Sequence, residues 1–187
     1  MRWGKTFLLW TWLLSVLALG GLLTLLHEAP LPAPSATAAA PTTTWTLTHG
    51  LAMRCPCSRR IVDHLLARGA TAEATEEVLL VDAMPATRSA LEARGFHVRS
   101  VDADTLPRLG FEAVPGLVIR SPEGRVAYAG AHAPRRTGPV DDLSLFVRAR
   151  EGAATTPFAV LGCAISQALT ARVDPLSLKS LPWGSTP

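Results

Sequence analysis

The pattern of apolar and polar positions after residue 44 predicts strands and helices in alternation. Short apolar or alternating runs predict strands at 45–48, 78–81, 96–101, 117–119 and 125–128. Apolar residues at helical spacing predict helices at 56–68, 85–95, 141–149 and 158–171, with a short helical turn at 106–109. The turn signal Ser121-Pro-Glu-Gly124 joins the last two strands into an antiparallel hairpin. Strand–helix alternation followed by a hairpin predicts an α/β fold with a mixed sheet.

The N-terminal 27 residues have a different pattern. Residues 6–26 hold no charge and, as a helix, match the thickness of a bilayer core. Arg2 and Lys5 precede this run, which predicts a transmembrane signal-anchor with the rest of the chain outside the cytoplasm. A cleaved signal peptide is the alternative, with Ala36-Thr37-Ala38 as a candidate site.

These patterns divide the chain into four parts. We expect a signal-anchor at 1–27, a Pro/Ala/Thr-rich linker that buries nothing at 28–44, one domain at 45–181 and a tail at 182–187. The expected location is the inner membrane, single-pass, with the soluble domain facing the periplasm.

Charge excludes one class of partner. Without Arg2 and Lys5 the chain holds 16 basic and 15 acidic residues. The domain therefore lacks the excess of positive charge that is typical of nucleic-acid binding. Hydrophobic residues make up 48% of the chain, which is enough for a core.

The segment Cys55-Pro-Cys-Ser58 carries the candidate chemistry, because it opens a predicted helix directly after a strand. A thiol at a helix N-terminus meets unsatisfied backbone N–H groups and the positive end of the helix dipole, which favour the thiolate. Pro56 suits the first helical position. The pattern therefore indicates a redox or metal role for Cys55 and Cys57.

With these residues the sequence resembles the thioredoxin superfamily, and more narrowly the membrane-anchored, TlpA-like thiol–disulfide oxidoreductases. The motifs that carry the resemblance lie between about Trp45 and Gly130: Cys55-Pro-Cys-Ser58, Val101-Asp-Ala-Asp104, Gly110-Phe-Glu-Ala-Val-Pro115, Gly116-Leu-Val-Ile119 and the SPEGRVAYAG hairpin. The resemblance implies a thioredoxin-like three-layer sandwich, protein thiol or disulfide substrates and no dissociable cofactor. It also implies a cis peptide bond between Val114 and Pro115, beside the active cysteine, where backbone groups pair with a substrate chain.

The cysteine spacing departs from this family, in which the second cysteine would stand at Ser58 and not at Cys57. Three mechanisms stay open. Cys55 and Cys57 form the redox pair, Cys55 acts alone with Ser58 as in monothiol glutaredoxin-like sites, or Cys163 resolves a disulfide with Cys55 or Cys57. Cys163 is otherwise a buried structural thiol.

Two further classes of function stand beside these. Cys55, Cys57 and a histidine, with Met53 nearby, offer soft ligands for copper, and some thioredoxin-fold proteins are copper chaperones. His132 is the best-placed histidine and His49 the other. A docking domain without catalysis is the third class. Arg135 and Arg136 lie in a Pro/Gly-flanked loop and are expected to be solvated.

Overall fold

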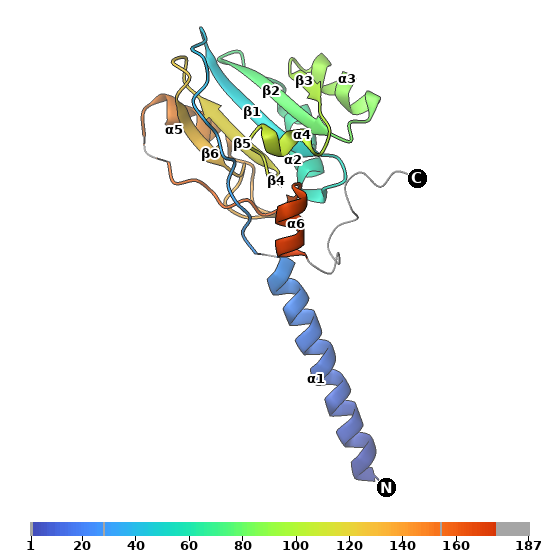
Figure 1. Cartoon of the computed structure of the whole chain (residues 1–187). Helices are drawn as coiled ribbons and strands as arrows, with labels where there is room; N and C mark the ends of the chain where they lie inside the picture. Colours follow the sequence, from blue (N-terminus) through green and yellow to red (C-terminus); the bar gives the residue numbers. More distant parts are fainter. Residues whose placement is uncertain (1, 28, 154, 175–187) are drawn as a thin grey trace.

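The computed structural model describes residues 2–27, 29–153 and 155–174, with no side-chain placement for residues 2–5 and 23–27. The expected tail at 182–187 and the last residues of the expected domain, 175–181, lie outside the described residues. A long N-terminal helix projects away from an α/β domain (Figure 1).

A five-stranded sheet forms the centre of the domain, in the order β3-β2-β1-β5-β6. β1 pairs in parallel with β2, and β2 with β3, whereas β5 runs antiparallel to both β1 and β6. The strands are β1 Trp45–Ala52, β2 Ala74–Val81, β3 His97–Ser100, β5 Gly116–Arg120 and β6 Val126–Gly130. The predicted mixed sheet is confirmed.

Alternate residues of each strand enter different cores. On β2, Val78 and Leu80 pack with Ile61 and Leu65 of α2, whereas Leu79 and Val81 pack with Leu106 of α4. The helices of the domain are α2 Pro56–Arg68, α3 Pro85–Ala93, α4 Thr105–Arg108, α5 Asp142–Arg150 and α6 Gln167–Val173. α2, α3 and α5 therefore cover one face, and the short α4 with loop residues covers the other.

The predicted helix at 158–171 is wrong in its first half. Residues 158–166 contain no helix, and β7 Cys163–Ala164 pairs antiparallel with β4 Ala113–Val114. Helix begins only at Gln167, after Ser166, whose Oγ accepts a hydrogen bond from the backbone N–H of Leu169. The apolar residues here are buried by pairing with a second strand and not by a helical stripe.

The predicted membrane anchor is not found. Helix α1 spans Arg2–His27, but among the described residues no helix has both the length and the hydropathy needed to cross a membrane.

The expected linker packs on the domain, contrary to prediction. Leu31 is 8% exposed and forms a β-bridge with Val160. The backbone N–H of Ser35 donates to the carbonyl of Gly110, and that of Ala39 to Gly124. Backbone groups supply most of these contacts, so composition alone did not indicate them.

Candidate active site

Cys55 occupies the junction between β1 and α2. A turn closed by a hydrogen bond from the Cys55 N–H to the Ala52 carbonyl (3.0 Å) leads into the helix, and Pro56 takes its first turn as predicted. Cys55 is the N-cap residue and is fully buried. The Ser58 backbone N–H donates to the Cys55 sulfur. We find no other role for Ser58 at this site, because its hydroxyl is buried without a partner among the described residues.

The fold brings Cys163 into direct contact with Cys55. The two Sγ atoms lie 2.7 Å apart and share a hydrogen bond, although 108 positions separate them in the sequence. All three cysteines are free thiols. A disulfide requires about 2.05 Å between sulfurs, so a small movement would join this pair.

The strand that carries Cys163 lies beside the proline loop. The Val114–Pro115 peptide bond is cis, the form that the resemblance implied. Val114 is the register partner of Cys163 across β4 and β7, and its carbonyl lies 3.9 Å from the Cys55 sulfur. Thus one backbone segment borders both cysteines.

The pKa of one of the three thiols is lowered, and the pKa values of the other two are raised. The hydrogen bond with Cys55 lowers the pKa of Cys163. The same hydrogen bond, together with burial, raises the pKa of Cys55 against the opposing effect of a hydrogen bond with Cys57. A hydrogen bond with Cys55 and burial raise the pKa of Cys57, although Arg136 works in the opposite direction. Among the three thiols only Cys163 has a lowered pKa, so the position of Cys55 at the helix N-terminus does not give it the lowered pKa that we expected.

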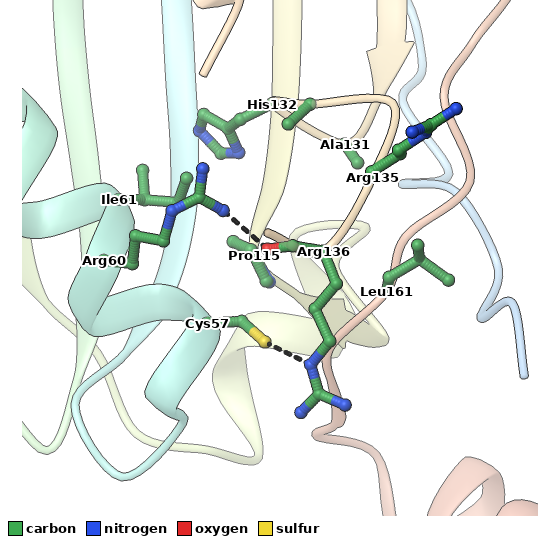
Figure 2. Close-up of a pocket in the computed structure, with 10 residues that line it drawn as sticks. Cys57, Arg60, Ile61, Pro115, Ala131, His132, Arg135, Arg136 and Leu161 are labelled. Atoms are coloured by element: carbon green, nitrogen blue, oxygen red, sulfur yellow. Dashed lines mark hydrogen bonds between the residues drawn. The ribbon is translucent and has the colours of Figure 1, made fainter. Parts of the chain in front are cut away.

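Cys57 lines a small cleft together with Pro115 and His132 (Figure 2). The Nε of Arg136 donates to the Cys57 sulfur over 3.2 Å, so Arg136 is not the solvated residue that we expected. Arg60 holds this loop in place by donating to the carbonyls of Arg136 (2.5 Å) and Gly138. The loop is thereby folded back over α2.

Behind the cleft lies a buried polar network. His132 hydrogen-bonds to His49 (3.0 Å), and His49 in turn to the Glu76 carboxylate (3.0 Å). Arg68 donates to both Glu76 and Asp142. The sequence analysis missed Glu76, Arg68 and Asp142, because nothing in their spacing marks side chains that meet only across the folded sheet.

Charge pairing and burial shift the pKa values in this network. Burial opposes ionisation of Glu76, but hydrogen bonds from Arg68 and His49 outweigh it and bring its pKa to about 2. For Asp142 burial is likewise outweighed, chiefly by the charge of Arg68, and the pKa is about 2. Burial lowers the pKa of His132 to about 3.

The copper ligand set that we considered is not assembled. One ring nitrogen of His132 is engaged by His49. Within the ranges that the structure describes, no group of three or more His, Cys, Asp or Glu side chains is arranged to hold a metal ion.

Sequence comparison finds no family model and no curated protein that matches this chain. Among solved structures, a hypothetical protein of Sinorhizobium meliloti 1021 superimposes with a TM-score of 0.53 at 16% identity, over 71% of this chain and 96% of that one. An uncharacterized conserved protein of Geobacillus kaustophilus gives a TM-score of 0.49 at 14% identity, over 74% and 90% of the two chains. The thioredoxin domain of a thiol-disulfide oxidoreductase of Bacteroides vulgatus gives 0.40 at 14% identity, over 65% and 94%. The first likeness shows a shared fold and nothing about activity.

Proposed function

We propose that this protein is a thiol–disulfide oxidoreductase of thioredoxin-like fold in which Cys55 and Cys163 interconvert between dithiol and disulfide. The observation that carries the proposal is the 2.7 Å separation of their Sγ atoms. Of the three mechanisms considered from the sequence, this favours the one in which Cys163 resolves the disulfide formed at Cys55. Cys57 is not needed as the partner.

The exchange uses both thiols in turn. The Cys163 thiolate takes the proton of Cys55 along their shared hydrogen bond, and the Cys55 thiolate attacks one sulfur of a partner disulfide. The other partner sulfur leaves as a thiolate and receives the proton from Cys163 through solvent. Cys163 then attacks the Cys55 sulfur, and the first partner sulfur departs. Counting the proton that Cys163 released to solvent when its thiolate formed, the protein loses two electrons and two protons. The second departing partner thiolate takes up that proton from solvent, and the partner becomes a dithiol.

The lowered pKa of Cys163 suits both directions of this cycle. A thiol of lower pKa is more often present as the attacking thiolate, and it also leaves faster when the internal disulfide is opened. Sulfur atoms carry all the electrons, so the cycle requires no dissociable cofactor. Protein thiols are the proposed substrates, in an extracytoplasmic compartment where such a disulfide persists.

The test is disulfide mapping on the full chain. Wild type, Cys57→Ser and Cys163→Ser are equilibrated over a glutathione gradient, quenched and analysed by mass spectrometry of tryptic peptides. We expect a reversible Cys55–Cys163 bond in wild type and in Cys57→Ser, and its loss in Cys163→Ser. A Cys55–Cys57 bond as the main oxidised form, or three thiols that stay reduced, would contradict the proposal.

A further inference from the structure

The position of β7 bears on what kind of partner reaches Cys55. β7 pairs with β4 through only two residues on each strand, Ala113 with Ala164 and Val114 with Cys163. The pairing continues with a hydrogen bond from the Ile165 N–H to the Glu112 carbonyl (2.8 Å). Within the described part of the chain, β4 has no other strand neighbour. An extended backbone thus presents a cysteine to Cys55 along the edge of β4.

This arrangement closes the site to external sulfur. Cys55 is 0% exposed, and Cys163 of β7 lies directly against its sulfur. The cycle proposed above requires a mixed disulfide at Cys55, and a partner sulfur cannot contact a fully covered atom. β7 must therefore leave β4 during the reaction.

The surrounding contacts restrict that movement to a few residues. Val160 is fully buried and bridged to Leu31, and Ile165 is 2% exposed in the core beside Cys55. Between these anchors, residues 161–163 are only partly buried. Lifting 161–164 breaks the short β4–β7 pairing, exposes the small buried side chain of Ala164 and leaves both anchors in the domain.

Gly162 shows which residue a strand paired with the edge of β4 needs before its cysteine. A Cβ atom at position 162 would overlap the carbonyl oxygen of Val114 and lie 2.8 Å from Cδ of Pro115. The first is a backbone atom and the second belongs to the proline ring, and neither can move aside as the end of a flexible side chain does. The residue before the cysteine must therefore be glycine for the strand to seat at this depth.

We propose that residues 161–164 occupy, as part of the same chain, the position on β4 that a substrate segment takes during the reaction. The partner is an extended protein segment with glycine immediately before its reactive cysteine. This inference rests on the proposed function and specifies its substrate class. When the partner is a dithiol, its cysteine thiolate attacks the Cys55 sulfur of the Cys55–Cys163 disulfide and expels Cys163 as a thiolate. The partner segment then takes the place of β7 on β4. The partner's second thiol attacks its own cysteine sulfur and releases Cys55, so the partner is oxidised and this protein is reduced by two electrons.

The test compares two peptides on one protein. Cys57→Ser/Cys163→Ser full-length protein, with Cys55 as its remaining thiol, is mixed with the glutathione mixed disulfide of Leu-Gly-Cys-Ala-Ile-Ser or of Leu-Ala-Cys-Ala-Ile-Ser. We expect the Gly-Cys peptide to form its adduct with Cys55 at least about tenfold faster, because a Cβ overlapping backbone disfavours docking. Equal rates for the two peptides would overturn the inference.

A second measurement uses the chain's own segment. In Gly162→Ala the added Cβ is expected to lift β7, so iodoacetamide should label Cys55 of the reduced protein several-fold faster than in wild type. Gly21→Ala, where an added Cβ meets nothing within 4 Å, is the matched control. Unchanged labelling in Gly162→Ala would show that glycine is not required there. Failure of the proposed function appears separately, as absence of the Cys55–Cys163 bond in the mapping experiment.

Discussion

The imidazole of His132 shares a hydrogen bond of 3.0 Å with that of His49, and its other ring nitrogen, Nδ1, is buried without a partner in the described structure. Glu76 accepts a hydrogen bond from Nε2 of His49. Protonating His132 as a cation would place a charge in a fully buried site, next to His49.

This relationship predicts a pH-dependent stability. The pKa of His132 falls from an ordinary 6.5 to about 3 on folding, so between these values the unfolded chain binds a proton that the folded chain does not. Stability is therefore complete above pH 6.5 and is lost as the pH falls, by about 1.4 kcal/mol per pH unit from this group. Urea unfolding between pH 7 and pH 4.5 measures the slope. His132→Gln should flatten it, whereas His97→Gln, at an exposed position of β3, should not. An unchanged slope in His132→Gln contradicts the assignment.

Glu76→Gln should destabilise the fold by about 3–5 kcal/mol, because it leaves Arg68 with one carboxylate fewer in a buried setting. Glu77→Gln next to it is the control. Glu77 is partly exposed and pairs with Arg99 at the surface, so its loss should cost no more than about 1 kcal/mol. Denaturant unfolding at pH 7 checks both, and similar losses in the two variants would refute a special role for the buried network.

Cys163 should be alkylated at lower pH than Cys57. Both are partly exposed, so exposure alone predicts similar rates. The pKa of Cys163 is lowered by its hydrogen bond with Cys55, whereas that of Cys57 is raised, and only the thiolate reacts. Iodoacetamide labelling from pH 6 to pH 9, resolved by peptide mass spectrometry, gives the order. Faster labelling of Cys57 at pH 7 would reverse the assignment of the thiolate.

Arg136→Met should slow the labelling of Cys57. Its guanidinium donates to the Cys57 sulfur and lowers the pKa of that thiol, so its removal decreases the thiolate fraction several-fold at pH 8. Arg135→Met changes a neighbouring arginine of the same cleft, which has no such hydrogen bond to a thiol in the described contacts. Equal labelling of Cys57 in both variants would show that Arg136 has no electrostatic effect on it.

Leu31→Ala should loosen the segment before β7. Leu31 is buried against Val160, and truncating a buried leucine costs about 2–5 kcal/mol where the site cannot collapse. We expect a lower unfolding midpoint and faster labelling of Cys55. Pro32→Ala, at an exposed neighbouring position, should change neither. If Leu31→Ala matches Pro32→Ala, the segment at 28–44 is the passive linker that its composition suggested.

The sequence by itself determined the elements whose signal is local. Strand 78–81 is a continuous apolar run, and Ile61 and Leu65 mark one face of α2, because a core requires those positions whatever their neighbours are. Pro56 predicted that the helix begins directly after Cys55, since proline is favoured in the first turn of a helix and disfavoured further along it. The candidate thiol and its place at the end of β1 followed from the same few residues.

Only the tertiary structure decided which residues meet. The first half of the 158–171 segment carries apolar residues that suit either a helix or a strand, and pairing with the edge of β4 made Cys163–Ala164 a strand. That pairing carried Cys163 to Cys55 across 108 positions, and the loop after β6 carried His132 to His49, which itself meets Glu76 of β2. Contacts of this kind depend on how separate elements pack, and no periodicity within one element records them.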